Sequence, residues 1–138
     1  MAINKFLFGI FFFLGIFCVN SYSFAARLHP EKVYQAQWCQ ANGGESEVRL
    51  ADNSRVDCVL EDYAIEFDFA NKWSEAIGQS LYYAYSLGKK AAIVLIMENY
   101  SADEKYLTRL NKIAGLYGIK VWTIGADYVE NNMISQLR

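Results

Sequence analysis

The chain has 138 residues, of which 54% are hydrophobic and 20% are charged, and its formal net charge is −2. This acidic balance argues against a domain that binds nucleic acid tightly through overall positive charge. The sequence shows no P-loop, no Cys/His set with zinc-binding spacing and no Ser-His-Asp arrangement. Carboxylate side chains are therefore the main candidates for a functional site.

Residues 1–25 have the pattern of a secretory signal peptide. Lys5 precedes an apolar run from Phe6 to Val19, and Ser23-Phe24-Ala25 supplies a small-x-small cleavage site. The run is short for a membrane span, which needs about 20 apolar residues, and a retained N-terminal anchor is the alternative. Cleavage leaves 113 residues with a net charge of −3, enough for one compact domain at 26–138. We expect a secreted or periplasmic protein with no stable membrane association after processing.

Three short strands are predicted over 45–50, 55–60 and 63–69, where apolar and polar side chains alternate. Asp52-Asn53-Ser54 supplies turn residues between the first two runs. The last two runs are separated only by Glu61-Asp62, the length of a tight hairpin turn. An antiparallel meander is therefore expected.

The hairpin turn fixes which side chains of the last two strands lie opposite each other. Leu60 then faces Tyr63, and Asp57 faces Glu66. Because successive side chains point to opposite faces, Asp68 shares the face of Asp57 and Glu66. The other face is apolar and consists of Val56, Cys58, Leu60, Ile65, Phe67 and Phe69.

Three carboxylates on one strand face create an electrostatic cost. Like charges placed opposite each other destabilise an antiparallel pair unless a cation or a proton lies between them. Mg²⁺ is a natural candidate, because it prefers oxygen ligands and needs only one or two protein carboxylates. The alternative is a solvated polar face, which antiparallel sheets often have. Pairing Val48 with Val56 would bring Glu47 opposite Asp57, either as a further metal ligand or as a solvent-facing strand residue.

A helix is predicted from Lys72 to Leu87, with Asn71 as its N-cap and Gly88 as its stop signal. A lysine in the first turn is disfavoured by the helix dipole, which indicates a use other than helix stability, such as neutralising charge at a phosphate. The alternative for Lys72 is a solvated surface side chain. A polar stripe of this helix starts directly after the acidic strand and contains Lys72, Glu75, Gln79 and Tyr83.

The rest of the domain is predicted to be scaffold. A helix over 31–42 precedes the strands, and the apolar run at 91–97 is typical of a strand buried on both faces. The capping box Ser101–Glu104 opens a helix that ends at Gly118, and a strand at 119–125 and a short helix follow. This order predicts an α/β sandwich around one mixed sheet. The fourth strand is parallel to the third, because a helix crosses over between them.

Two cysteines, Cys39 and Cys58, remain after the predicted cleavage, in a chain directed to an oxidising compartment. Cys58 points to the apolar strand face, and the first helix, which carries Cys39, could pack there. We expect a disulfide, with two free buried thiols as the alternative. A bridge that closes a loop of this size contributes about 3 kcal/mol in the loop-entropy model, and it would hold the adjacent Asp57 in place.

The acidic strands and the following helix together resemble a known nuclease family. Asp57, then Glu66-Phe67-Asp68, then Gln79 and Tyr83 on a helix, is similar to the pattern of the PD-(D/E)XK nuclease superfamily. The resemblance covers about residues 30–97. It implies a restriction-endonuclease-like fold with helices on both faces of the sheet. It also implies that Asp57 and Glu66 bind Mg²⁺ or Mn²⁺ and that Gln79 and Tyr83 position the water or the substrate.

The sequence departs from the family pattern at Asp68, which stands where the catalytic lysine is usual. In some members the lysine has moved to the following helix, and Lys72 is placed to take its role. The expected function is a metal-dependent nuclease-like phosphodiesterase that acts on DNA or RNA outside the cytoplasm. The alternative is an inactive nucleic-acid-binding or protein-interaction domain on the same fold. The expected site consists of Asp57, Glu66, Asp68, Lys72 and Gln79, with Glu47 as a further metal ligand and Tyr83 as a positioning residue.

Overall fold

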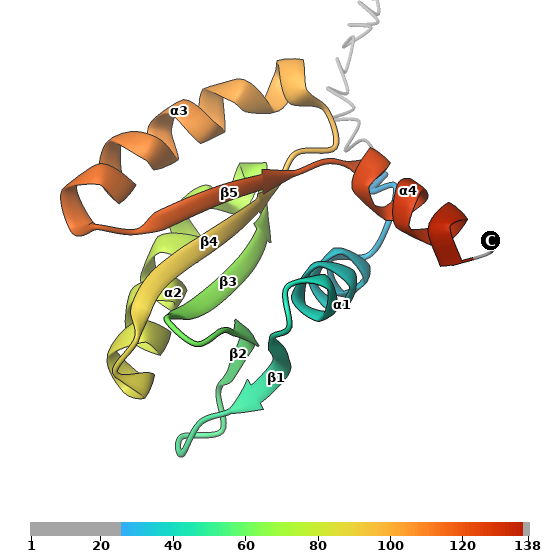
Figure 1. The fold of residues 1–138 in the computed structure, drawn as a ribbon. Coiled ribbons are helices and arrows are strands. Elements are labelled where there is room, and N and C mark those ends of the chain that lie inside the picture. The colour runs from blue at the N-terminus through green and yellow to red at the C-terminus, as the bar shows by residue number, and fades with distance from the viewer. Residues whose placement is uncertain (1–25, 137–138) are drawn as a thin grey trace, which may run out of the picture.

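A computed structural model describes residues 26–136 of the chain (Figure 1). The predicted signal peptide, residues 1–25, lies outside this range. Within the range, none of the helices combines the length and the apolar composition that a membrane crossing requires. The elements are α1 (Glu31–Ala41), β1 (Glu45–Arg49), β2 (Arg55–Val59), β3 (Tyr63–Phe69), a 3₁₀ turn (Ala70–Lys72), α2 (Trp73–Leu87), β4 (Lys90–Ile96), α3 (Tyr100–Tyr117), β5 (Lys120–Ile124) and α4 (Ala126–Gln136).

The strands form one five-stranded mixed sheet in the order β1-β2-β3-β4-β5. β1, β2 and β3 pair antiparallel, whereas β3, β4 and β5 pair parallel, because α2 and α3 each cross over between neighbouring strands. The α/β fold class, the antiparallel meander and the parallel fourth strand expected from the sequence are confirmed.

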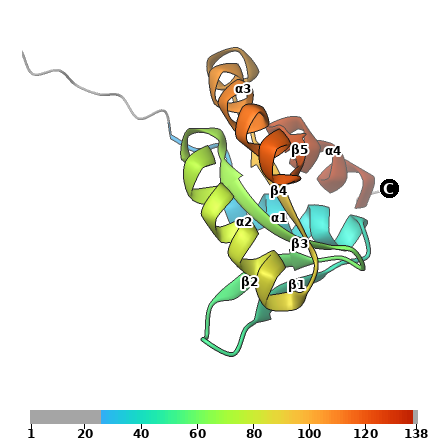
Figure 2. The ribbon, with the colours of Figure 1, turned by 90° about the vertical axis from the view of Figure 1, so that its left-hand side faces the viewer.

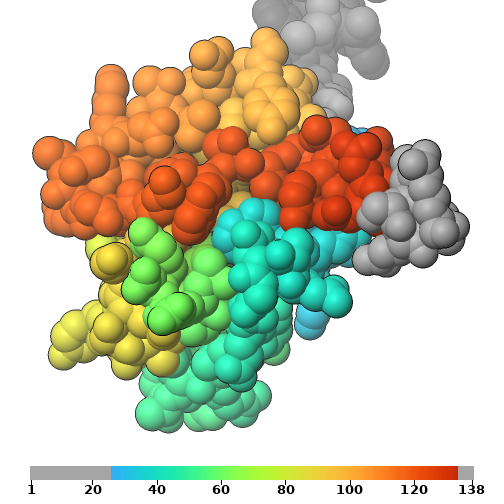
Figure 3. Space-filling model, viewed as in Figure 1, coloured from blue at the N-terminus to red at the C-terminus, as the bar shows by residue number. Residues whose placement is uncertain are grey.

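Helices cover both faces of the sheet (Figure 2). α2 and α3 pack on one face, where Ala76 and Leu110 join a buried cluster with Ile93 and Leu95 of β4. α1 and α4 pack on the other face, where Trp38 and Val129 join a second cluster. Figure 3 shows α1 and α4 side by side over this second face. The sheet is thus the middle layer of a three-layer sandwich.

The hairpin register predicted from the turn length is confirmed. Leu60 N donates to Tyr63 O across the two-residue turn, and Cys58 pairs with Ile65. β1 pairs with β2 as predicted, with Val48 opposite Val56. The placement of Val56 on the face of Cys58 was wrong, because Val56 packs into the cluster beneath α2 together with Val48. Away from the hairpin turn, β2 stays beside β1 and diverges from β3 (Figure 2). Counting alternate residues from the turn therefore no longer gives the correct sheet face for this part of β2.

The helix ends agree only in part with the sequence signals. Gly88 and Gly118 end α2 and α3 in the left-handed conformation, with φ of 63° and 66°, as expected. α2 begins one residue later than predicted, after a 3₁₀ turn, and Asn71 does not cap it. α3 is capped by Asn99, whose side chain accepts a hydrogen bond from Ala102 N, so the cap lies before the predicted Ser101–Glu104 box.

The disulfide between Cys39 and Cys58 is confirmed. It joins α1 to β2 in the cluster on the α1 face of the sheet. Gly44 lies directly against both sulfur atoms, because a Cβ at this position would come within 2.6 Å of Cys58 Sγ and 2.7 Å of Cys39 Sγ. α1 is therefore held on the strand that carries Asp57.

Candidate functional site

The site starts where β2 and β3 part. In a continued antiparallel ladder, Phe67 N–H would donate to the backbone carbonyl of Val56. It donates instead to Asp57 Oδ2, at 2.8 Å. The Asp57 side chain thus replaces a backbone acceptor and stands in the space between the two strands.

Two further carboxyl groups lie on the α2 side of β3. Glu66 and Asp68 are only 5% and 4% exposed. Asp68 Oδ1 accepts a hydrogen bond from Phe69 N at 2.9 Å and lies 3.9 Å from Lys72 Nζ. Glu66 Oε2, by contrast, is buried and has no hydrogen-bond partner. An unpaired buried carboxylate oxygen is costly, so this atom marks the place where a proton or a cation is needed.

Burial raises the pKa values of all three carboxyl groups. Burial raises the pKa of Glu66, and the negative charges of Asp57 and Asp68 and a side-chain hydrogen bond with Asp57 raise it further. Burial also raises the pKa of Asp57, although the hydrogen bond from Phe67 N–H opposes this shift. Asp68 has its pKa raised to about 7, first by burial and then by the charge of Glu31, against the effect of Lys72. Without a cation between them, the groups therefore retain protons at pH values where isolated carboxyls are ionised.

Glu31 is a fourth member of the cluster, and the sequence reasoning missed it. It is the first residue of α1, and its charge acts on Asp57, Glu66 and Asp68. Burial raises its pKa, against the lowering effect of Lys72 and of a side-chain hydrogen bond with Asp68. Its position depends on how α1 docks on the sheet. An acidic residue directly after Pro30 at a helix start was the only local signal for it.

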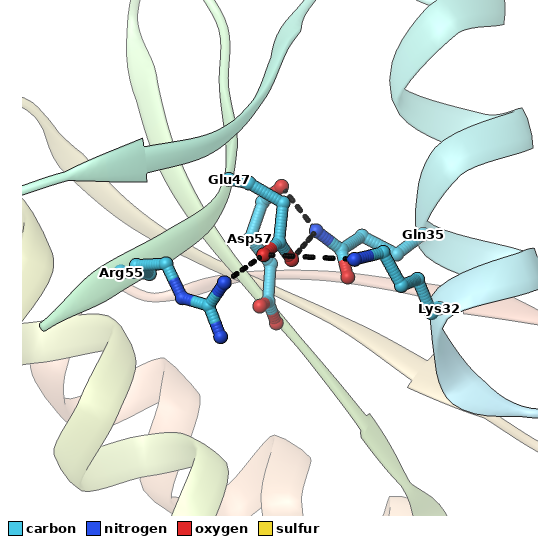
Figure 4. Close-up of polar contacts among 5 residues, drawn as sticks. All are labelled: Lys32, Gln35, Glu47, Arg55 and Asp57. Carbon is cyan, nitrogen blue, oxygen red and sulfur yellow. Dashed lines mark hydrogen bonds and ion pairs between the residues drawn. The ribbon is translucent and has the colours of Figure 1, made fainter.

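Glu47 lies next to this cluster but its carboxylate is engaged elsewhere (Figure 4). It pairs with Arg55 at 2.8 Å and accepts a hydrogen bond from Gln35 Nε2 at 2.9 Å. Gln35 is buried and also donates to the backbone carbonyl of Asp57, at 2.7 Å. The hydrogen bond from Gln35 and the charge of Arg55 lower the pKa of Glu47. In Figure 4 the carboxylate of Asp57 lies outside this network, whose effect is to fix the backbone of Asp57.

Gln79 and Tyr83 of α2 lie on the same side of the sheet as the acidic cluster. Burial raises the pKa of Tyr83, a hydrogen bond with Gln79 lowers it, and the charges of Glu66 and Asp57 raise it. Tyr83 is buried in the cluster beneath α2, whereas Gln79 is exposed. The structure therefore brings together Asp57, Glu66, Asp68, Lys72, Gln79 and Tyr83, and adds Glu31.

Within residues 26–136, no three Asp, Glu, His or Cys side chains already stand in an arrangement that encloses a metal ion. Asp57 is held on Phe67 N–H and Asp68 on Phe69 N–H, so their carboxylates point at the backbone. The donor set nevertheless suits a hard divalent cation, because it consists of carboxylate oxygens. The partnerless Glu66 Oε2 supplies an oxygen available for such an ion.

No known protein family, characterised protein or solved structure matches the chain.

Proposed function

We propose that the protein is a metal-dependent phosphodiester hydrolase of the nuclease type, built on a restriction-endonuclease-like sandwich. The observation that carries the proposal is Glu66 Oε2, a buried oxygen without a partner, in a cluster with the carboxyl groups of Asp57, Asp68 and Glu31. Four carboxyl groups whose pKa values are raised by burial favour the uptake of a compensating cation at neutral pH.

In this proposal Glu66 and Asp57 hold Mg²⁺ or Mn²⁺, with Asp68 and Glu31 completing the oxygen ligands. Such an ion activates a water molecule and offsets the charge that develops on the phosphate. Glu47 does not bind the ion directly, since Arg55 and Gln35 occupy its carboxylate. Its role is to fix the backbone of Asp57 through Gln35.

Lys72 takes the role of the catalytic lysine. The family pattern usually has that lysine at the position that Asp68 occupies in this chain. The ammonium of Lys72 lies 3.9 Å from Asp68 Oδ1, and its side chain is 50% exposed, so it reaches the cluster from the solvent side. From there it orients the attacking water or neutralises charge on the phosphate. Gln79 is exposed beside Tyr83 and positions the substrate backbone.

The setting of the reaction is outside the cytoplasm. A disulfide joins α1, which carries Glu31, to β2, which carries Asp57. Such bonds form and persist in oxidising compartments, in agreement with the signal peptide expected at residues 1–25.

The second candidate is an inactive relative that binds nucleic acid or protein on the same fold. The ion pair between Lys72 and Asp68 favours it, because a lysine held by a carboxylate is less available to a substrate. The two candidates differ in what Glu66 does. An inactive domain has no use for a metal at this residue.

The deciding experiment is a cleavage assay with the oxidised protein on single- and double-stranded DNA and RNA, with Mg²⁺, Mn²⁺ or EDTA. The proposal predicts cleavage with Mg²⁺ or Mn²⁺, none in EDTA, and none by Glu66→Gln. Glu104→Gln is the matched control, because Glu104 is an exposed glutamate on α3, and it should cleave normally. Activity that persists both in EDTA and in Glu66→Gln would refute the assignment.

A further inference from the structure

Four exposed cationic side chains border the acidic cluster, in a protein whose overall charge is negative. Each of these side chains either contacts a residue of the cluster or its neighbour Glu47, or acts on one of the cluster's residues through its charge. Lys72 lies beside Asp68, and Arg27 lowers the pKa of Glu31. The other two act through Glu47, which pairs with Arg55 at 2.8 Å and lies 4.0 Å from Lys32.

Arg27 is held in place by two contacts. Its guanidinium carbon lies 3.8 Å from the ring centroid of Phe69, the last residue of β3. One of its nitrogens, Nη2, donates a hydrogen bond to Asn71 Oδ1, next to Lys72 in the chain. Arginine carries five N–H donors in a planar fork, and Arg27 is exposed, so the donors not used by Asn71 are accessible from solvent.

The backbone before α1 is also fixed. Leu28 N and His29 N donate to Glu98 Oε1 at 3.0 and 3.3 Å, and Tyr34 O–H donates to the same oxygen at 2.8 Å. Arg27 therefore stands at a defined place at the end of β3. An arginine that is stacked and hydrogen-bonded in advance loses little side-chain freedom when it binds an anion.

The four cationic side chains lie on both sides of the place where β2 and β3 part. We call these two sides the β2 arm and the β3 arm of the hairpin. Arg55 belongs to β2, and Lys72 is the last residue of the 3₁₀ turn that follows β3. Arg27 joins the β3 arm through Phe69 and Asn71. Lys32 of α1 pairs with Glu47 of β1, which in turn pairs with Arg55 on the β2 arm. A chain of phosphates that crosses the site could engage both arms.

We propose that Arg27, with Lys72 on its own arm and Arg55 and Lys32 on the other, binds the backbone phosphates that flank the cleaved bond of a polynucleotide. This inference rests on the proposed function and names the residues that hold the backbone of its polymeric substrate. Phosphate contacts of this kind fix register along the backbone and carry no base preference.

Binding is measured in the Glu66→Gln protein, in EDTA, so that the substrate is bound and not cut. Fluorescence anisotropy of a labelled single-stranded DNA oligonucleotide is followed over a range of KCl concentrations. Each phosphate contact contributes about 0.7 to the slope of log K against log salt for a single strand. Adding Arg27→Gln should lower that slope by about 0.7 and weaken binding equally for different base sequences.

Two further variants make the test specific. Arg27→Lys keeps the charge and should restore the slope, although the stacked fork is lost. Arg109→Gln is the matched control, because Arg109 is exposed on α3 and also lies over an aromatic ring, that of Tyr106. It should change neither affinity nor slope.

The proposal is overturned if Arg27→Gln keeps the parent slope, if Arg27→Lys fails to restore it, or if the parent does not bind the oligonucleotide. Hydrolysis of bis(p-nitrophenyl) phosphate by the wild-type protein with Mn²⁺ tests the proposed function separately. If the protein hydrolyses this small diester but shows no salt-dependent oligonucleotide binding, the proposed function stands and the proposed phosphate contacts are refuted.

Discussion

Asp57 Oδ2 accepts a 2.8 Å hydrogen bond from the backbone N–H of Phe67, where a backbone carbonyl of β2 would otherwise have paired with β3. One side chain thus terminates a hairpin ladder and joins a carboxyl cluster. The parting of the strands provides the space in which Asp57, Glu66 and Asp68 meet the first residue of α1, Glu31.

Without metal, the protein should become less stable as the pH rises from 5 to 8. The pKa of Asp68 is raised from 3.8 to about 7, so between these values the folded state binds more protons than the unfolded state. That stabilisation is complete below the unfolded pKa and is lost as the pH passes the folded one. Glu66 and Asp57 shift in the same direction. Thermal unfolding in EDTA should give a lower Tm at pH 8 than at pH 5.

The variant Asp68→Asn should flatten this dependence, because an amide does not titrate. Glu104→Gln, on the surface of α3, should keep it. A wild-type Tm that increases from pH 5 to pH 8 in EDTA would contradict the raised pKa values.

Lys72→Gln should slow cleavage strongly and retain metal binding. The side chain lies beside the cluster but supplies no ligand, so its loss removes charge neutralisation at the phosphate without removing oxygen donors. The expected loss is about 10²- to 10³-fold in kcat, as for other preorganised donors at a developing charge. Lys112→Gln, an exposed change on α3, should have no effect. Normal turnover by Lys72→Gln would remove Lys72 from the mechanism.

Gln35→Met should destabilise the fold by about 1–3 kcal/mol, because it leaves the backbone carbonyl of Asp57 and one Glu47 oxygen without their buried donor. The change keeps the length of the side chain, so the effect reports mainly on the hydrogen bonds. Gln40→Met on the exposed side of α1 is the control and should be close to neutral. Urea unfolding measures both, and equal stability of the two variants would show that Gln35 does not hold β2.

Gly44→Ala should destabilise the oxidised protein by about 1–3 kcal/mol, a usual cost of overpacking. The new Cβ would meet two sulfur atoms at 2.6 and 2.7 Å, and the disulfide cannot move aside as a free side chain can. Gly115→Ala within α3 meets nothing within 4 Å and should stabilise by up to about 1 kcal/mol through helix propensity. Comparable stabilities of the two variants would contradict the packing of Gly44 on the bridge.

The turn of two residues was sufficient to predict the hairpin register, with Cys58 opposite Ile65, because strand periodicity and turn length are local properties. The disulfide was predicted from the expected export to an oxidising compartment and from the apolar face of Cys58. The end of α2 followed from Gly88, whose left-handed conformation is a local property as well.

What the sequence could not predict depends on packing between distant segments. Glu31 lies in the cluster only because α1 packs on the sheet. The carboxylate of Glu47 is bound by Gln35 and Arg55. Val56 changes face because β2 leaves β3 and follows β1. None of these placements produces a periodic pattern in the sequence from which it could be predicted.

The most direct measurement is calorimetric titration of Mn²⁺ into the oxidised wild-type protein and its Glu66→Gln variant, at a pH above the raised pKa of Asp68. The proposed site predicts a saturable Mn²⁺ site in the wild type, with protons released on binding, and its loss in Glu66→Gln. Glu104→Gln should bind as the wild type does. If the wild type binds no Mn²⁺, or if Glu66→Gln binds it equally well, Glu66 is not a metal ligand and the central claim is wrong.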